Sequence, residues 1–249
     1  MENKTVVITG AGSGMGKSMA LLFAGEGAKV IVSDIKSERV EAVVKEIKLK
    51  GGAALGIVTN ISNEEEAKKL IVAAINNYDS LDVLVNNAGV MDDFTPAADV
   101  SDELWNRVMG VNLNGPFYTC RLAIPQMLKQ GKGVIINVSS VGGLNGARAG
   151  AAYTASKHGL IGLTKNIGFM YGPKGIRCNA IAPGGVNTNI MEGANPNKFG
   201  SERMNTGTGS NIRMAEPMEI AETALFLASD KASNINGTII VADGGWTAY

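Results

Sequence analysis

Short runs of apolar and β-branched residues alternate with longer helical patterns along almost the whole chain. These runs do not alternate between apolar and polar positions, as expected for strands that are covered by helices on both faces. Strands that alternate with helices are joined by right-handed crossovers and form a parallel, doubly wound sheet. The sequence therefore predicts an α/β fold. The expected strands, about seven in number, are TVVITG, KVIVSD, AALGIVTN, LDVLVNNAG, GVIINVSS, IRCNAIAPG and GTIIVADGG.

The helical patterns and their connections contain no repeat, linker or change in composition that would mark a second domain. We therefore expect residues 1–249 to form a single domain. One irregular stretch, from about residue 189 to 215, is rich in Asn, Gly and Met. A segment of this length without regular structure is usually a lid or disordered, and we expect a substrate lid. The expected helices cover residues 16–26, 37–50, 64–78, 102–129, 152–171 and 217–229.

Composition excludes several classes of protein. Hydrophobic residues make up 45% of the chain and charged residues 18%, which is typical of a packed globular protein. Lys and Arg balance Asp and Glu at 23 each, so charge gives no reason to expect a nucleic-acid partner. No apolar run reaches the roughly 18 residues that cross a bilayer, and the first residues enter a strand pattern without a secretory signal. We expect a cytoplasmic protein that binds no membrane.

The cysteines and the acidic residues give no convincing metal-ligand cluster. Cys120 and Cys178 lie in apolar stretches without metal-ligand spacing, and we interpret both as reduced core residues rather than a disulfide. Asp92 and Asp93 resemble a carboxylate pair, but adjacent acids in a loop are usually solvated. We therefore expect no metal.

A glycine-rich turn, TGAGSGMG, joins the first strand to the first helix. Its Gly10, Gly14 and Gly16 form the pattern G-x-x-x-G-x-G. Such a turn lets the backbone approach a pyrophosphate and directs the N-terminus of the helix at the anion, although it is also found with a purely structural role. A P-loop is excluded because its G-K-[ST] ending is not at the required distance: for Gly16, Lys17 and Ser18 to be that ending, position 11 would have to be glycine, and it is Ala11. The position after the first strand favours a dinucleotide site.

Asp34 closes the second expected strand, 18 residues after Gly16. A carboxylate at this position accepts hydrogen bonds from an adenosine ribose and repels a 2′-phosphate. Ser13 adds no positive charge to the glycine turn. Lys17 and Lys36 are near in sequence, but both are able to point into water. The pattern favours NAD over NADP.

Tyr153 and Lys157 are four residues apart, so on a helix they share a face. A phenol has a pKa of about 10, which is too high for ready proton exchange at neutral pH. An ammonium about 4 Å away attracts a phenolate by roughly 4 kcal/mol, which predicts a tyrosine pKa lowered by about one to three units before desolvation subtracts its share. Alone, the pair also fits an ordinary amphipathic helix. His158, the only histidine, falls beside this face, and we expect a packing or surface residue.

Five motifs occur together in one order. They are TGAGSGMG, NNAG (86–89), INVSS (136–140), YTASK (153–157) and APGGVNT (182–188). In this combination the chain resembles the short-chain dehydrogenase/reductase family over essentially its whole length. The resemblance implies a Rossmann-type sheet and hydride transfer between a nicotinamide cofactor and a carbonyl or alcohol.

The resemblance also implies roles for individual residues. Tyr153 would be the general acid/base, and Lys157 would hold the nicotinamide ribose and lower the pKa of the tyrosine. Ser140, 13 residues before Tyr153, would steady the substrate oxygen. Asn112, in MGVNLNG, would support a water-linked proton relay. The less favoured neighbours are Ser139 and Asn114.

The cofactor contacts follow from the same resemblance. Thr188 would bind the nicotinamide amide or the pyrophosphate, and the backbone of Val186 would meet that amide. At VTNIS the family usually has an aspartate, so Asn60 should make a weaker, uncharged contact with adenine. The full predicted set is Gly10, Ser13, Gly14, Met15, Gly16, Asp34, Ile35, Asn60, Ile61, Asn87, Ala88, Gly89, Tyr153, Lys157, Pro183, Gly184, Val186 and Thr188.

The substrate is the least defined part of the prediction. Methionine-rich walls suit an apolar, adaptable site, although these methionines would also serve to anchor a lid. This favours a moderately apolar ketone or secondary alcohol, such as a steroid or a cyclic compound. The candidate walls are residues 91–95 and 142–147, with Gly185, Asn187, Ile190, Met191, Phe199, Met204 and Met214.

Two other functions are considered. A 3-oxoacyl-carrier-protein reductase would use NADPH and dock an acidic carrier on a basic patch, for which Lys129, Lys132 and Lys174 are candidates. A nucleotide-binding protein without catalysis is disfavoured because all four catalytic residues are present.

Family members are mostly dimers or tetramers, so the resemblance implies a homo-oligomer, a tetramer or a dimer, joined through residues 102–129 and 152–171. The C-terminal GGWTAY is expected to reach a neighbouring subunit. Otherwise Trp246 and Tyr249 would form an exposed aromatic end.

Overall fold

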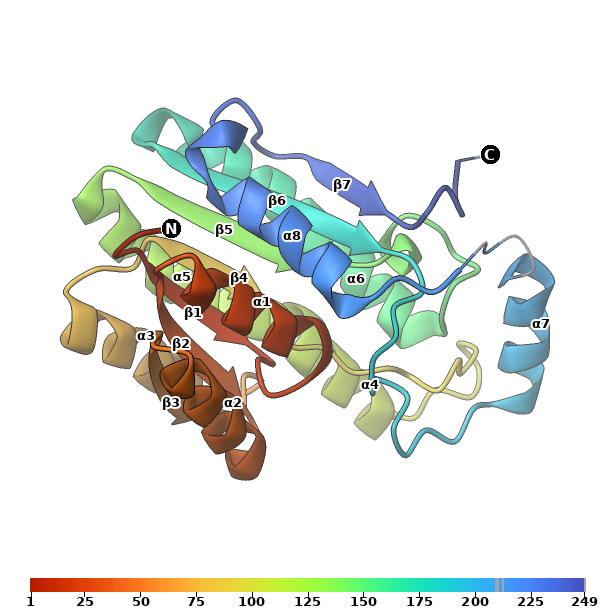
Figure 1. The fold of residues 1–249 in the computed structure, drawn as a ribbon. Helices are drawn as coiled ribbons and strands as arrows, with labels where there is room; N and C mark the ends of the chain where they lie inside the picture. Colours follow the sequence, from red (N-terminus) through yellow and green to blue (C-terminus); the bar gives the residue numbers. More distant parts are fainter. Residues whose placement is uncertain (209–210, 212, 249) are drawn as a thin grey trace.

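The computed structural model describes residues 1–208, 211 and 213–248, and within them the chain forms one seven-stranded sheet (Figure 1). The strands are β1 (Thr5–Thr9), β2 (Lys29–Asp34), β3 (Ala53–Val58), β4 (Val83–Asn86), β5 (Gly133–Val138), β6 (Ile176–Pro183) and β7 (Ile239–Ala242). Their order is β3-β2-β1-β4-β5-β6-β7, and neighbouring strands pair in parallel. The sheet grows in both directions from β1, which confirms the predicted doubly wound α/β fold.

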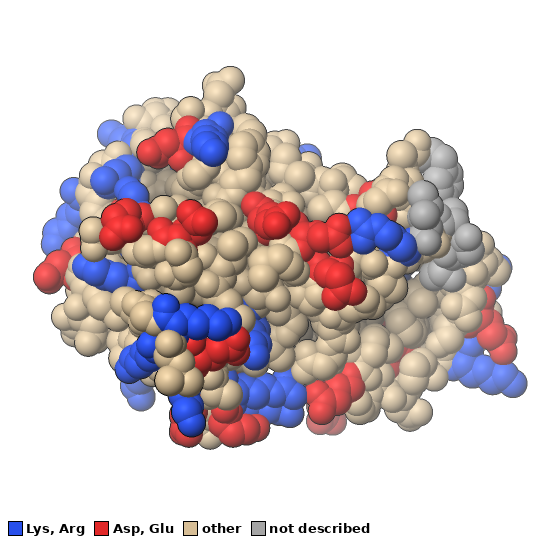
Figure 2. Space-filling model, viewed as in Figure 1, with Lys and Arg blue, Asp and Glu red and all other residues tan. Residues whose placement is uncertain are grey.

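Helices cover both faces of the sheet (Figure 1). One layer contains α1, α2 and α8, and the opposite layer contains α3, α5 and α6. The helices are α1 (Gly14–Gly25), α2 (Ser37–Leu49), α3 (Glu64–Tyr78), α4 (Asp102–Met109), α5 (Gly115–Gln130), α6 (Ala151–Tyr171), α7 (Lys198–Thr208) and α8 (Pro217–Ala228). On the face viewed in Figure 2, acidic and basic side chains are intermingled.

Alternate residues of each central strand contribute to two separate cores. Val6 and Ile8 pack with the α1, α2 and α8 layer, whereas Val7 packs with the α3, α5 and α6 layer. All three are fully buried, because helices exclude water from both sides of the strand. Cys120 and Cys178 are buried in the second core and are free thiols, as the apolar context predicted. None of the described helices is both long and apolar enough to cross a membrane.

The helix α3 has the bounds that its sequence pattern predicted. The side chain of Asn63 accepts hydrogen bonds from the amides of Glu65 and Glu66, and three acids occupy the first turn, where the helix dipole favours negative charge. At the other end Asp79 adopts a left-handed conformation with φ of 57° and stops the helix. Local capping chemistry therefore fixes both ends.

The single helix expected over residues 102–129 is wrong in detail. The structure has α4, then a π-helical turn over Gly110–Asn114, then α5. A Cβ on Gly115 would lie only 3.0 Å from atoms of Ile61, so the chain packs tightly where the geometry changes. Wide turns of this kind are frequent at functional sites, and this one carries Asn112.

The stretch from 189 to 215 is more regular than its composition indicated, because it contains α7. The side chain of Asn197 accepts from the amide of Gly200 at 2.9 Å and so caps this helix. Beyond α7, Ala215 forms a single bridge with Val186, which returns the chain to the end of β6. Residues 209, 210 and 212 of the predicted lid lie outside the described residues, as does Tyr249.

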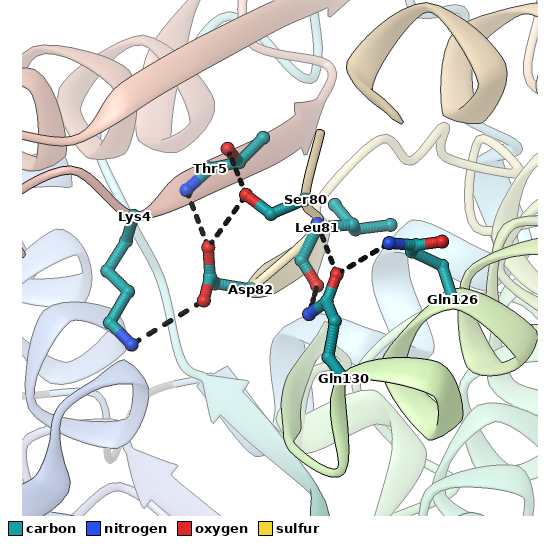
Figure 3. Close-up of polar contacts among 7 residues, drawn as sticks. All are labelled: Lys4, Thr5, Ser80, Leu81, Asp82, Gln126 and Gln130. Atoms are coloured by element: carbon teal, nitrogen blue, oxygen red, sulfur yellow. Dashed lines mark hydrogen bonds and ion pairs between the residues drawn. The ribbon is translucent and has the colours of Figure 1, made fainter. Parts of the chain in front are cut away.

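Polar contacts tie the amino ends of β1 and β4 together (Figure 3). The carboxylate of Asp82 accepts from the amide of Thr5 at 2.9 Å. The side chain of Gln130, at the end of α5, both accepts from and donates to the backbone of Leu81, at 2.9 and 3.0 Å. These bonds satisfy backbone groups at the sheet edge that lies opposite the carboxyl ends of the strands.

Candidate active site

A cavity of about 410 Å³ lies at the carboxyl ends of β1, β2 and β4. Here the chain order of the sheet reverses, and open α/β sheets bind ligands at this switch point. The predicted cofactor residues that line it are Gly10, Ser13, Gly14, Met15, Asp34, Ile35, Asn60, Ile61, Asn87, Ala88, Gly89 and Thr188. Those outside its lining are Gly16, Tyr153, Lys157, Pro183, Gly184 and Val186.

The glycine turn before α1 depends on close backbone packing. Gly10 and Gly14 have φ values of 62° and 50°, which only glycine adopts readily. A Cβ on Gly16 would lie 2.1 Å from the carbonyl oxygen of Gly10, so Gly16 packs inside the turn rather than against the cavity. Ser13 precedes α1 without making a side-chain capping bond. The first N–H groups of the helix therefore remain available to an anion.

Asp34 lies at the end of β2, as predicted, and lines the cavity. Its Oδ2 accepts from the amide of Gly12 at 3.0 Å, and its Oδ1 accepts from the amide of Lys36 at 3.1 Å. These bonds fix the carboxylate in place. Of the two lysines considered from the sequence, Lys36 lines the cavity, whereas Lys17 pairs with Glu46 at 2.9 Å.

Sequence reasoning missed Arg39 and Glu192, which also line the cavity. Arg39 Nη1 donates to Ser13 Oγ at 3.4 Å, and its Nη2 pairs with Glu192 at 2.9 Å. The position of Arg39, five residues after Asp34, was a usable signal for a cation at this end. Nothing in the sequence indicated the partnership with Glu192, because it joins residues 153 positions apart.

The side-chain oxygen of Asn60, which we expected to contact adenine, is already hydrogen-bonded to Ser62. The amide oxygen of Asn60 already accepts from the backbone N–H and the hydroxyl of Ser62, at 3.1 and 2.7 Å. An adenine amino group would have to share this oxygen. The hydrogen bonds from Ser62 should therefore weaken the contact between Asn60 and adenine more than the absence of a carboxylate charge does by itself.

Asn87 joins the NNAG turn to the glycine turn. Its amide nitrogen donates to the carbonyls of Thr9 and Gly10, at 3.0 and 3.1 Å. The hydroxyl of Thr9 accepts from the backbone amides of Asn87 and Ala88. The side-chain oxygen of Asn87 is buried and has no partner among the described residues. A nucleotide hydroxyl or amide is a donor of the kind that this oxygen lacks.

Tyr153 and Lys157 lie one turn apart on α6 and are both buried. The ammonium nitrogen of Lys157 lies 5.5 Å from the centre of the Tyr153 ring and donates to the carbonyl of Val138 at 2.8 Å. The Ser140 side chain is hydrogen-bonded to that of Tyr153 and also accepts from the amide of Gly142 at 3.0 Å. The structure thus brings together three of the four predicted catalytic residues at the carboxyl end of β5.

Asn112 joins the same group from the π-helical turn. Its side chain exchanges two hydrogen bonds with the backbone of Val90, at 2.9 and 3.0 Å, and donates to the hydroxyl of Ser156. A Cβ on Gly89 would lie 3.5 Å from both Asn112 Oδ1 and Lys157 Nζ, so these two polar groups approach the same point. The amide is therefore well placed to help orient the lysine.

Three sequence neighbours of these residues are placed elsewhere. Ser139 Oγ donates to the backbone carbonyl of Lys157 rather than approaching the tyrosine hydroxyl. Asn114 and His158 are exposed, and a ring nitrogen of His158 contacts the carbonyl of Thr154. The surface position expected for the histidine is therefore confirmed.

Comparison with known proteins identifies the family. A family model described as enoyl-(acyl carrier protein) reductase matches residues 10–247. The 3β-hydroxysteroid dehydrogenase 2 of Eggerthella lenta is 41% identical over 251 residues, which cover 100% of this chain and 96% of that protein. The chain belongs to the short-chain dehydrogenase/reductase family. It is an oxidoreductase acting on CH–OH groups.

Two further similar proteins have names that indicate other substrates, and one of them has NADP bound. The 3-oxoacyl-[acyl-carrier-protein] reductase FabG of Thermotoga maritima is 40% identical over 98% of each chain. A solved structure from Beutenbergia cavernae, assigned as an NAD(P)-dependent gluconate 5-dehydrogenase with NADP bound at low occupancy, is 34% identical with a TM-score of 0.89. It covers 100% of this chain and is itself covered to 98%.

The predicted lowering of the Tyr153 pKa in this short-chain dehydrogenase/reductase is wrong for the geometry observed. Burial raises the pKa of Tyr153 to about 12, against the hydrogen bond from Ser140, and the charge of Asp92 raises it further. Burial also lowers the pKa of Lys157 to about 8. Desolvation thus outweighs the attraction that the four-residue spacing indicated. The error arose because the spacing gives proximity but not burial.

Asp92 and Asp93 in this dehydrogenase/reductase are not the solvated loop pair that the sequence indicated. Asp92 is fully buried, and its two oxygens accept from the amides of Gly150 and Tyr153, at 3.0 and 2.8 Å. Asp93 is half-buried and lines the cavity. Burial raises the pKa of Asp92, and the backbone hydrogen bonds oppose this effect.

The predicted cofactor residues after β6 divide into two groups. Val186 forms the bridge to Ala215, and a Cβ on Gly184 would lie 2.8 Å from the side chain of Asp243. Pro183 is buried in the last position of β6. These three shape the turn, while Thr188 reaches the cavity and lies beside Gly14.

The C-terminal segment folds back on its own chain. Trp246 is only 7% exposed, and the guanidinium of Arg148 lies 4.4 Å from the centre of its ring. Trp246 therefore does not form the exposed aromatic end that was the alternative to a contact with a neighbouring subunit. Asp243 holds the turn through the amide and hydroxyl of Thr247.

Proposed function

We propose that this enzyme transfers a hydride between NAD(H) and a secondary alcohol or ketone, with Tyr153 as general acid/base. The observation that carries the proposal is the joint burial of Tyr153, Lys157 and Asn112 beside a nucleotide-sized cavity at the switch point of the sheet. Ser140 adds a hydroxyl bonded to the tyrosine. Together these four side chains would supply the positioned acid and the hydrogen-bonding groups that proton transfer to a carbonyl oxygen requires.

The cavity suits a dinucleotide. The first turn of α1 would hold the pyrophosphate, Asp34 would accept from the adenosine ribose, and the unpaired oxygen of Asn87 would receive a donor. When bound, the nicotinamide supplies or accepts the hydride. The protein holds the ribose near Lys157 and keeps water away from the reacting carbon.

Tyr153 would give its proton to the substrate oxygen in reduction and take it back in oxidation. With a pKa raised to about 12, the phenol holds its proton at neutral pH, which suits the acid role. For the base role the charged form of Lys157 has to approach the phenolate, since an opposite charge favours ionisation. Ser140 would orient the substrate oxygen, and Asn112 would hold the lysine.

We infer a preference for NAD over NADP from the charges at the ribose end of the cavity. Asp34 is fixed there by two backbone amides, and Glu192 places a second carboxylate nearby. Arg39 is the cation that would attract a 2′-phosphate, but its guanidinium is paired with Glu192. The NADP held by the Beutenbergia cavernae structure argues for measuring both cofactors.

We also propose that residues 189–215 form a lid over an apolar substrate. A second cavity, of about 740 Å³, lies between the start of α6 and α7, and its lining includes Phe94, Phe199 and Met204. A Cβ on Gly185 would lie 2.5 Å from the sulfur of Met214, so at least one of the predicted methionines anchors the lid. The name of the Eggerthella lenta relative agrees with a steroid-like or cyclic substrate.

The test is a screen of secondary alcohols and ketones, including 3β-hydroxysteroids and cyclohexanols, followed through NADH absorbance. We expect turnover of apolar cyclic compounds and higher kcat/KM with NAD(H) than with NADP(H). Absence of turnover with every alcohol and ketone would contradict the function, and a reversed cofactor ratio would contradict the preference for NAD.

A second candidate function, reduction of a carrier-bound 3-oxoacyl thioester with NADPH, draws support from the similarity to the Thermotoga maritima enzyme. Its expected docking lysines weigh against it. Lys132 precedes β5, and Lys129 and Lys174 are exposed in neighbouring segments near the amino ends of β5 and β6. The catalytic residues lie at the opposite, carboxyl edge. Rapid NADPH-dependent turnover of an acetoacetyl thioester would reverse this ranking.

We propose that the enzyme is a homo-oligomer, a dimer or a tetramer, joined through α5 and α6. Phe117 on α5 and Phe169 and Met170 on α6 are 42%, 81% and 59% exposed, and a contact between copies of the chain through these helices would cover them. Light scattering should give a multiple of the chain mass. The Phe169→Glu variant should shift that mass toward the monomer, and a wild-type monomer would contradict the proposal.

A further inference from the structure

The first turn of α6 is capped by a residue from elsewhere in the chain. The helix begins after Gly150, which has no side chain to cap it, and its first turn contains no acid. Asp92, in the segment between β4 and α4, supplies the missing acceptor from 58 residues upstream. Its Oδ1 accepts from the amide of Gly150 at 3.0 Å, and its Oδ2 accepts from the amide of Tyr153 at 2.8 Å.

The same segment leaves little freedom at the start of α6. The amide of Ala151 donates to the carbonyl of Thr95 at 3.0 Å, next to the two bonds to Asp92. A Cβ on Gly150 would lie 2.6 Å from Asp92 Oδ2 and 2.5 Å from the amide nitrogen of Thr95. Position 150 is therefore packed against both residues. The rotation and axial position of the turn that carries Tyr153 are set by this contact.

We propose that Asp92 is a positioning residue for Tyr153: its carboxylate fixes the first turn of α6, and its negative charge favours the protonated phenol. The proposal rests on the proposed role of Tyr153 as general acid/base. A serine or asparagine cap would supply the hydrogen bonds without the charge. Asp92 is fully buried, so water does not screen the effect of its charge on neighbouring groups.

The charge of Asp92 acts in the same direction as burial. Both raise the pKa of Tyr153, and the hydrogen bond from Ser140 opposes them. Other charged groups on the elements packed around the tyrosine are Lys157 and Lys165 on its own helix, Asp102, Glu103 and Arg107 on α4, Asp93 next to Asp92, and Arg148 in the segment before α6. Arg107 is held at the carbonyl of Met91 at 3.2 Å. The charge of Asp92 therefore helps to keep the proton on the phenol for ketone reduction.

The segment that contains Asp92 also holds the beginning of α7. The carbonyl of Asp93 accepts from the amide of Asn197 at 2.8 Å. A Cβ on Gly200 would overlap the carbonyl oxygen of Phe94. One short segment is therefore joined to the turn of the general acid/base and to the helix of the proposed lid.

The test compares Asp92→Asn with Asp102→Asn, which makes the same change of charge at an exposed position in the first turn of α4. Asp92→Asn keeps an acceptor oxygen but removes the charge. We expect it to retain NADH affinity within about 2-fold, to lose roughly 10- to 100-fold in kcat, and to move the midpoint of the kcat–pH profile to lower pH. Asp102→Asn should leave the midpoint unchanged, because water screens its charge.

A second variant separates position from charge. Gly150→Ala keeps the carboxylate in the chain, but its Cβ would lie 2.6 Å from Asp92 Oδ2 and 2.5 Å from the amide nitrogen of Thr95, so the segment 92–95 has to shift relative to the helix. It should lower kcat with a smaller shift of the pH midpoint than Asp92→Asn. Normal kcat in both variants, even with lowered thermal stability, would overturn the proposal, because the contact would then be only structural.

Failure of the proposed function has a different signature. If the wild type turns over no alcohol or ketone, the role of Asp92 is still measured by ultraviolet titration of tyrosinate, with Tyr153→Phe versions of wild type and Asp92→Asn as blanks. A lower Tyr153 pKa in Asp92→Asn supports the action of the charge. An equal or higher pKa overturns it, with or without turnover.

Discussion

The two ends of the nucleotide cavity are built in different ways. Beside the end where we place the chemistry, Tyr153, Lys157 and Asn112 lie outside the lining of the cavity and are 7%, 3% and 0% exposed. At the adenosine end the side chains of Arg39 and Glu192 are 26% and 61% exposed, although they form a close ion pair. Water screens the second group and barely reaches the first, so equal changes of charge have unequal consequences. The effect of a substitution should therefore follow burial more closely than distance from the cavity.

The largest effect is expected from Tyr153→Phe at the buried end. Removal of one hydroxyl deletes the proton donor, and general acid/base groups commonly contribute about 10²- to 10⁴-fold in rate. We expect a loss of kcat in this range with NADH affinity changed by less than about 3-fold. The control is Tyr171→Phe at the far end of the same helix, which should retain activity. Activity in Tyr153→Phe close to wild type would remove the tyrosine from the mechanism.

Lys157→Met should inactivate the enzyme while making it more stable near neutral pH. The pKa of Lys157 is lowered to about 8 from 10.5, so the unfolded chain binds more protons between these values. Stability therefore rises with pH across this window, and below it the buried charge costs roughly 3 kcal/mol. Methionine removes that cost but also loses the bond to Val138.

The measurement is thermal unfolding of Lys157→Met and wild type from pH 7 to 10. The advantage of the variant should be largest at pH 7 and shrink toward pH 10. Tyr153 has the opposite sign, since a pKa raised to about 12 gives a contribution that is lost only between about pH 10 and 12. A constant difference between variant and wild type across the range would mean that Lys157 is not desolvated as described.

Gly10→Ala tests the glycine turn before α1, which lines the cavity between its two ends. The residue has φ of 62°, and a Cβ would lie 2.8 Å from the Cα of Ala88, so both strain and contact oppose the substitution. We expect roughly 10- to 100-fold weaker NADH binding by fluorescence titration. Gly25→Ala, where a Cβ meets nothing within 4 Å, is the control. Equal affinities in both variants would show that the turn does not hold the nucleotide.

Features that depend on neighbouring residues could be predicted from the sequence, and features that depend on distant residues could not. Elements with local signals were placed well, and Glu64–Tyr78 agrees at both ends because its capping residues are contiguous with the helix. The residues of the five motifs lie close together, because the carboxyl ends of the parallel strands meet at one edge of the sheet. Asp92 was misread because its capped helix starts 58 residues later. The pKa of Tyr153 was misread because burial depends on the packing of distant segments around the pair.

The smallest effect is expected at the exposed end, from Glu192→Gln. Loss of the carboxylate releases Arg39, whose guanidinium lies beside Ser13 and Asp34 at the position where a 2′-phosphate would add charge. We expect NADPH to bind about 2- to 5-fold more tightly, with NADH affinity unchanged, because solvent screens the pair. Glu38→Gln, which removes an exposed acid next to Arg39 in sequence, is the control. If both variants shift NADPH affinity equally, only the overall charge matters. A shift in Glu192→Gln alone, falling as salt is raised, would show that this ion pair helps to select NAD, and that the lid residue carrying the acid takes part in cofactor choice.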